Sequence, residues 1–167
     1  MRQKYWPAII LMVVLGGWHL TPVAAAETQV RFSLGSAAFL DELIPFDHFL
    51  VGGAVRFYLT PHLSVEPEFL YMRGPETDRD YILASSLAYD LGKSDQFRFY
   101  VVGGAGLLHH TEKFPGAPDP DYSVDSWTAS GGIGAQIFLT DRIFVAPEFR
   151  LGWEPLFRIT GSIGYAF

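Results

Sequence analysis

Apolar residues recur at every second position along most of the chain after residue 26. The C-terminal segment is the clearest case, because apolar residues at 157, 159, 163, 165 and 167 alternate with Arg158, Thr160 and Ser162. Alternation of period two over this length predicts β-strands rather than helices. The same pattern predicts seven further strands, near residues 30–34, 51–59, 63–72, 81–91, 97–108, 126–139 and 143–153.

The segments between these predicted strands alternate in length. Residues 39–48, 73–80 and 109–125 form long segments, whereas 60–62, 92–96, 140–142 and 154–156 form short ones. Strands of about ten residues, joined by long loops at one end and tight turns at the other, are typical of transmembrane barrels. The short final connection breaks this trend. The pattern predicts an all-β fold, an eight-stranded antiparallel transmembrane β-barrel with an up-and-down meander.

One stretch of sequence occurs twice, 80 residues apart. Residues 59–69 and 139–149 both begin with Leu-Thr and end with Pro-Glu-Phe. Each copy predicts a strand, a tight turn and a second strand, so both turns should lie at the same end of the barrel. Pro67 and Pro147 fall on the apolar faces of their strands, and proline cannot donate to a β-ladder. We therefore expect a local bulge at each proline.

The first 26 residues have the three parts of a secretory signal peptide. Arg2 and Lys4 precede an apolar run over 8–17, and small residues precede the expected cleavage point. We therefore expect a cleaved signal peptide over residues 1–26 and a β-barrel domain over residues 27–167. Cleavage would remove two cations and change the net charge from −6 to −8.

The composition favours a surface that meets lipid. The chain is 49% apolar, 16% aromatic and only 18% charged. The polar faces of the strands carry no lysine, although a surface in water normally does. Aromatic residues gather near the strand ends of the apolar faces, as interfacial girdles require. We predict that the apolar faces meet lipid and the polar faces line the interior; a soluble barrel with the opposite orientation is the alternative.

Two features exclude whole classes of function. The chain has no cysteine, which rules out a disulfide scaffold, a thiolate zinc site and a cysteine nucleophile. Its negative net charge argues against nucleic acid as the main partner, because phosphate binding needs a basic surface.

The predicted inward faces collect five arginines and four acids. An eight-stranded barrel is just wide enough for its side chains to fill it, so these charges should pair as arginine–carboxylate forks. We expect a lumen ion-pair network that plugs the barrel; the alternative is a gate in which re-pairing opens a narrow path for small ions. The network would comprise Arg31, Arg56, Glu66, Glu68, Asp90, Arg98, Glu148, Arg150 and Arg158.

These features together resemble a known family. The signal peptide, the eight alternating strands, the repeated hairpin and the terminal Tyr165-Ala166-Phe167 are similar to the small outer-membrane β-barrel proteins of Gram-negative bacteria, of the OmpA-like, opacity type. The resemblance implies a monomer in the cell outer membrane, in contact with outer-membrane lipids and lipopolysaccharide. It also implies that Tyr165 and Phe167 form a C-terminal assembly signal for the barrel assembly machinery, although Ser162 stands where glycine is usual.

The function is less specific, because this family hosts many roles. Some related barrels modify lipopolysaccharide with serine, histidine and an acid; here His109 and His110 are candidates, but neither begins a His-x-Ser motif. Histidines and acids between 109 and 125 could offer zinc or calcium ligands, but no spacing matches a known site. We therefore expect no enzyme activity, no cofactor and no metal.

The expected role is structural or one of surface interaction. The long segment 109–125 is the candidate contact for an extracellular partner, because recognition on rigid scaffolds usually lies in loops. A narrow porin-like channel for small solutes and a lipopolysaccharide-modifying enzyme are the alternatives.

Overall fold

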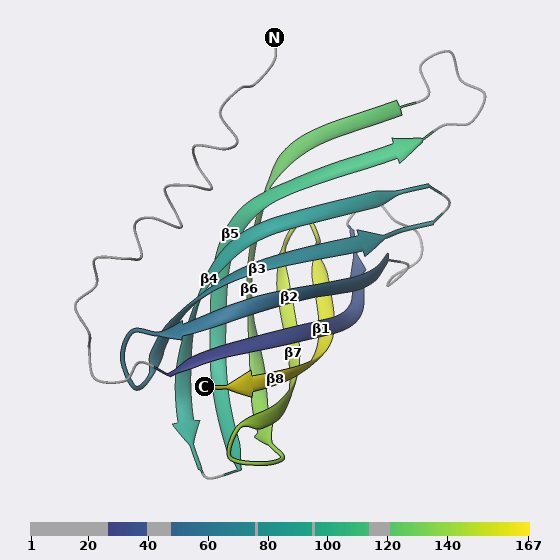
Figure 1. The fold of residues 1–167 in the computed structure, drawn as a ribbon. Coiled ribbons are helices and arrows are strands. Elements are labelled where there is room, and N and C mark those ends of the chain that lie inside the picture. Colours follow the sequence, from purple (N-terminus) through teal and green to yellow (C-terminus); the bar gives the residue numbers. More distant parts are fainter. Residues whose placement is uncertain (1–26, 40–47, 76, 95, 114–120) are drawn as a thin grey trace.

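The computed structural model describes residues 27–39, 48–75, 77–94, 96–113 and 121–167, which form a closed antiparallel barrel of eight strands (Figure 1). Each strand pairs with its neighbours in sequence, and β1 pairs with β8 to close the barrel. This confirms the predicted fold. The strands are β1 (Thr28–Ala38), β2 (His48–Tyr58), β3 (Leu63–Arg73), β4 (Arg79–Lys93), β5 (Phe97–Lys113), β6 (Asp121–Phe138), β7 (Ile143–Trp153) and β8 (Phe157–Ala166).

The predicted signal peptide, residues 1–26, lies outside the described residues. Within the part of the chain that is described, no helix is long and apolar enough to cross a membrane.

The alternating pattern places polar side chains inside the barrel and apolar ones outside. In β1, Arg31 and Ser33 are buried in the interior, whereas Phe32 between them is 50% exposed on the outer wall. In β8, Ser162 is buried and Ile163 is 55% exposed. An apolar outer wall of this kind is what a barrel in lipid requires.

The two copies of the repeated sequence form the same turn. In each copy the amide of the leucine donates to the carbonyl four residues later, at 2.8 Å. The hydroxyl oxygens of Thr60 and Thr140 each accept the amide three residues later, at 2.9 Å. Both turns lie at the end of the barrel that holds Thr28 and Phe167, which we call the terminal end; the opposite end is the loop end.

The prediction of a bulge at each proline is wrong. The β2–β3 register is the same on both sides of Pro67, and the β6–β7 register is the same on both sides of Pro147. Each proline instead interrupts the ladder on one side, where two residue pairs are missing without an inserted residue, because proline lacks the amide hydrogen. A register shift does occur between Asp90 and Gly92, at the terminal end of β4.

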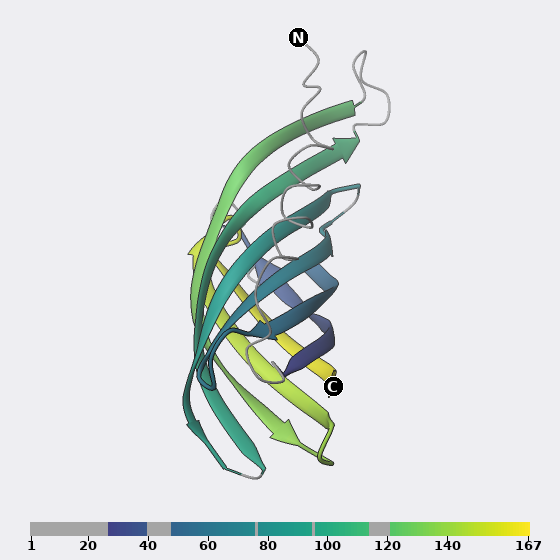
Figure 2. The same cartoon turned by 60° about the vertical axis from the view of Figure 1, so that its left-hand side comes forward.

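The prediction that residues 109–125 form a loop is also wrong. Strands β4, β5 and β6 have 15, 17 and 18 residues, longer than a bilayer needs. His109–Lys113 pairs in continuous register with Asp121–Asp125, and only the connection over residues 114–120 lies outside the described residues. Figures 1 and 2 show β5 and β6 projecting beyond the other strands at the loop end. The alternation fades there because both faces of this hairpin leave the apolar layer of the membrane.

Candidate functional site

The inward side chains form successive layers along the barrel axis. On β3, Glu66 and Glu68 are followed toward the loop end by Leu70 and Met72, and all four are buried. The strands therefore position charged groups at the centre of the barrel, apolar groups above them, and a polar mouth at the loop end.

Glu66 lies at the centre of the charged layer. Its side chain is fully buried, and three arginines from three strands contact it. Arg31 of β1 donates to Oε1, Arg56 of β2 donates through Nε to Oε2 at 2.7 Å, and Arg150 of β7 reaches Oε1 at 3.4 Å. One carboxylate thus holds β1, β2 and β7 against β3.

Glu68 and Glu148 extend this network around the barrel wall. Arg158 of β8 donates through Nη2 to both oxygens of Glu68, at 2.8 and 2.9 Å. Arg150 bridges the two carboxylates, with Nη1 at 3.2 Å from Glu68 and Nε at 2.6 Å from Glu148. Arg31 donates to Glu148 at 3.0 Å. Seven of the nine predicted lumen residues therefore lie in one continuous network.

The remaining two predicted residues, Asp90 and Arg98, lie apart from it at the terminal end. Arg98 Nε is 3.5 Å from Asp90 Oδ2, and Arg98 also donates to the Tyr58 hydroxyl. Its Nη1 donates to Glu27 at 3.0 Å. Glu27 is not among the predicted lumen residues, because it falls directly after the expected cleavage point and precedes the first alternating strand.

Tyr100 is a member of the central network that the sequence reading missed. Its hydroxyl donates to Glu148 at 2.8 Å, and the Arg56 guanidinium carbon lies 4.3 Å from its ring centroid. This cation–π contact stabilises the Arg56 guanidinium, whose Nη1 and Nη2 have no hydrogen-bond partner in the described part of the chain. A side chain at Gly134 would collide with the Tyr100 ring. Its place on the polar face of β5 could have identified Tyr100 as a lumen residue from the sequence.

An apolar layer lies on the loop-end side of the charged network, along the inner faces of β1 to β5. It consists of Ala37, Leu50, Leu70, Met72, Ile82 and Leu108, with Phe39 and Ala84 packed against it. This layer was not predicted, although several of its residues fall on the polar faces of their strands. Aliphatic side chains that fill a lumen exclude water from it.

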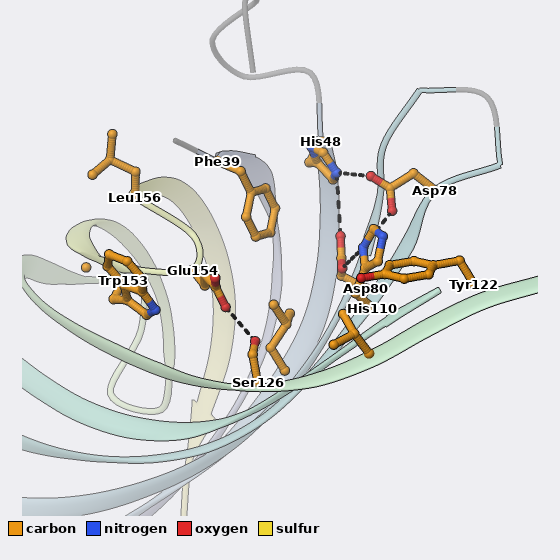
Figure 3. Close-up of a pocket in the computed structure, with 13 residues that line it drawn as sticks. Phe39, His48, Asp78, Asp80, His110, Tyr122, Ser126, Trp153, Glu154 and Leu156 are labelled. Atoms are coloured by element: carbon orange, nitrogen blue, oxygen red, sulfur yellow. Dashed lines mark hydrogen bonds and ion pairs between the residues drawn. The ribbon is translucent and has the colours of Figure 1, made fainter. Parts of the chain in front are cut away.

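A cavity of about 630 Å³ lies beyond the apolar layer at the loop end (Figure 3). One side of it is polar: His48 lies 2.8 Å from Asp78, and His110 lies 2.9 Å from Asp80. The other side carries apolar groups, including Phe39, Trp153 and Leu156. Ser126 donates a hydrogen bond to Glu154 across the mouth.

His109 takes no part in this cavity. It contacts Asp125 at 2.7 Å on the exposed surface of the β5–β6 hairpin. Of the two histidines that the sequence singled out, only His110 therefore lines the cavity. His48, Asp78 and Asp80 were missed because they come from segments far apart in sequence, with no recognisable spacing.

Tyr165 and Phe167 lie at the terminal end, on the same face of the C-terminal strand. Their ring centroids are 5.0 Å apart. Arg142, in the turn before β7, donates to the Tyr165 hydroxyl at 3.0 Å, and this hydrogen bond raises the pKa of Arg142.

The profile of the outer membrane protein beta-barrel domain matches residues 10–166. Three solved barrels share the fold. The N-terminal β-barrel domain of Pseudomonas aeruginosa OprF is 16% identical, with a TM-score of 0.63 over 85% of this chain and 99% of that one. Neisserial surface protein A is 11% identical, with a TM-score of 0.66 over 86% and 98%.

Ail of Yersinia pestis, solved in complex with the heparin analogue sucrose octasulfate, is 14% identical, with a TM-score of 0.59 over 86% of this chain and 100% of that one. At these identities the structures establish a shared fold and nothing more. No curated protein sequence matches the chain significantly. The predicted resemblance is confirmed by the profile match, which spans almost the entire sequence: the chain belongs to the outer membrane protein β-barrel domain family and is an integral protein of the outer membrane.

Proposed function

We propose that this protein is a non-conducting, non-enzymatic barrel with a structural or surface-interaction role, its terminal end in the periplasm and its loop end outside the cell. The observation that carries the proposal is the double closure of the lumen. A buried arginine–carboxylate network fills the centre, and the aliphatic layer around Leu50, Leu70 and Met72 lies above it.

The double closure argues against an ion gate. A gate requires a second stable arrangement of the charged groups. In the central network four arginines share Glu66, Glu68 and Glu148, so any exchange that withdraws a carboxylate leaves a buried arginine without a partner, which is costly. Re-pairing would also leave the aliphatic layer in place. Both features support a closed lumen.

Single-channel recording tests the closed lumen. The refolded protein in a planar bilayer should give no conductance steps above the baseline, while an open porin in the same bilayer serves as the positive control. A triple variant, L50A/L70A/L108A, combined with Glu66→Gln removes parts of both closures and should be the first to leak. Discrete steps from the unaltered protein would rule out the plugged barrel and favour the narrow channel.

The β5–β6 hairpin supports the surface-interaction part of the proposal. Residues 121–128 of β6 pair with β5, while pairing with β7 begins at Ala129. In the described part of the chain this stretch therefore has an unpaired edge, which an extended segment of a partner protein could join as an added strand.

Replacing residues 109–125 by a tight turn tests this part. Bacteria that display the shortened barrel should adhere to host cells or matrix proteins less than bacteria that display the full chain. Equal amounts of both proteins in the outer-membrane fraction, measured by immunoblot, provide the control, and the faster gel mobility of the unheated barrels shows that both are folded. Unchanged adhesion would exclude the hairpin as the contact surface.

The hydroxyl contacts support the absence of catalysis. Ser126 donates to Glu154 rather than to a histidine. A His-x-Ser sequence occurs at His62 to Ser64, but there the serine is buried and donates to the Ala88 carbonyl. Incubation of the protein with lipopolysaccharide should leave the mass of lipid A unchanged; a loss or gain of an acyl chain would contradict the proposal.

The outward aromatic pair at the terminal end supports the proposed assembly signal. Phe167→Ala should lower the amount of protein inserted in the outer membrane of living cells severalfold. Refolding of the same variant into detergent should be unchanged, since that process needs no assembly machinery. Equal reduction in both assays would mean that Phe167 contributes to stability rather than to recognition.

A further inference from the structure

Two histidines and two aspartates converge on the inner wall of the loop-end cavity (Figure 3). His48 begins β2, Asp80 is the second residue of β4, and His110 lies on β5. Asp78 precedes β4 in a turn, where its amide donates to the Pro75 carbonyl at 3.1 Å. Three strands of a closed barrel therefore position His48, Asp80 and His110, and the turn before β4 positions Asp78.

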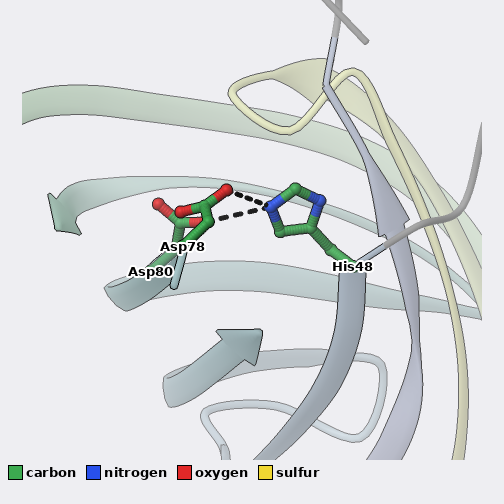
Figure 4. Close-up of side chains that lie close together, drawn as sticks. All are labelled: His48, Asp78 and Asp80. Carbon is green, nitrogen blue, oxygen red and sulfur yellow. Dashed lines mark hydrogen bonds and ion pairs between the residues drawn. The ribbon is translucent and has the colours of Figure 1, made fainter. Parts of the chain in front are cut away.

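The two aspartates divide their oxygens between the two histidines. His48 Nε2 lies 2.8 Å from Asp78 Oδ2 and 3.5 Å from Asp80 Oδ2 (Figure 4). His110 Nδ1 lies 3.2 Å from Asp78 Oδ1 and 2.9 Å from Asp80 Oδ1. The Oδ2 atoms thus face His48, and the Oδ1 atoms face His110. The donor atoms of His48, Asp78 and Asp80 lie within 4.8 Å of one another.

Burial makes it costly to keep these two carboxylates charged side by side. His48 and Asp80 are each only 1% exposed, and Asp80 Oδ2 has no hydrogen-bond partner among the residues that the structure describes. Two adjacent carboxylates repel each other unless a cation lies between them. A Cβ atom at Gly74 would collide with His48 Nε2 and Asp78 Oδ2, so the backbone at Gly74 lies directly against the cluster.

We propose that His48, Asp78 and Asp80 bind a divalent transition metal, with Zn²⁺ as the best match, and that His110 orients the two carboxylates. One imidazole and two carboxylates suit zinc, whereas Ca²⁺ and Mg²⁺ prefer ligand sets made of oxygen alone. Three protein ligands leave a position that faces the cavity, open to water or to a donor atom of a ligand. Ligating carboxylates in metal sites are usually hydrogen-bonded in turn. Here His110 Nδ1 is hydrogen-bonded to Asp80 Oδ1, and the same nitrogen lies 3.2 Å from Asp78 Oδ1.

Calorimetric titration with ZnCl₂ tests the proposal on the full barrel, refolded in detergent without a polyhistidine tag. The unaltered protein should bind one Zn²⁺ per chain. His48→Asn and Asp80→Asn should each weaken binding more than about 100-fold, and His110→Asn should weaken it by about 10- to 100-fold, the range for a supporting residue.

His109→Asn is the matched control, because that histidine contacts an aspartate outside the cavity. It should bind Zn²⁺ like the unaltered protein. The faster gel mobility of the unheated barrel shows that each variant is folded. The proposal is overturned if the unaltered protein takes up no Zn²⁺, if His48→Asn binds it as tightly, or if Ca²⁺ competes at equal concentration.

Discussion

A few buried side chains hold the interior together, and each of them serves several partners. Glu66 contacts Arg31, Arg56 and Arg150, and Tyr100 joins Glu148 to the face of Arg56. The alternation of polar and apolar positions along each strand predicts which of these residues face inward. It does not predict which groups pair, because pairing depends on the stagger between strands, and Asp90 and Arg98 accordingly lie outside the central network.

Loss of the Glu66 charge should destabilise the barrel. Glu66→Gln leaves three buried arginines with too few carboxylates, and breaking a buried ion pair typically costs about 3–5 kcal/mol. Urea-induced unfolding in lipid vesicles measures this change. Glu112→Gln, on the projecting part of β5, should change the free energy of unfolding little; equal effects of the two substitutions would contradict the assigned role of Glu66.

A methyl group at Gly134 should disturb Tyr100. The ring cannot move away easily, because its hydroxyl contacts Glu148 and its face contacts Arg56. Gly134→Ala should therefore cost about 1–3 kcal/mol, as overpacking does in a filled interior. The control is Gly131→Ala, which points outward and meets its nearest atom at 3.7 Å. A tolerated Gly134→Ala would mean that Tyr100 is free to shift.

At the scale of the element, a strand can be predicted from the sequence where one of its faces meets lipid and the other faces the lumen. β7 and β8 are apolar on one face along their whole length, so their bounds could be read from the sequence. The loop-end halves of β5 and β6 lack this contrast, and the same segment appeared to be a loop. The prolines of β3 and β7 affect the pairing in a way that the apolar periodicity does not predict. Each proline interrupts the β-ladder at two residue pairs and leaves the register unchanged.

The position of an outward residue along its strand should decide the cost of a charge there. Ile163→Arg, near the middle of β8, should destabilise the barrel by about 2–4 kcal/mol. Leu139→Arg, in a turn at the terminal end, should cost at most about 1 kcal/mol because its side chain reaches water. Refolding yields in lipid vesicles compare the two variants. Similar yields for both would place the middle of β8 outside the bilayer core.

At the scale of the whole molecule, the protein is a barrel with an apolar outer wall and a filled interior. The alternation and the composition were enough to predict the closed meander and the direction of its faces. The apolar layer and the loop-end cluster of His48, Asp78 and Asp80 could not be predicted, because both assemble residues from separate strands whose relative stagger only the closed barrel defines.

The absence of cysteine from the chain permits the most direct test of this closed interior. Ser162→Cys places a thiol on the inner wall, and Ser94→Cys places one in an exposed turn at the terminal end. In the folded barrel, a charged water-soluble thiol reagent should modify the cysteine at 94 and leave the one at 162 unmodified until urea unfolds the chain. Rapid modification at position 162 in the folded protein would show a water-filled lumen and contradict the account.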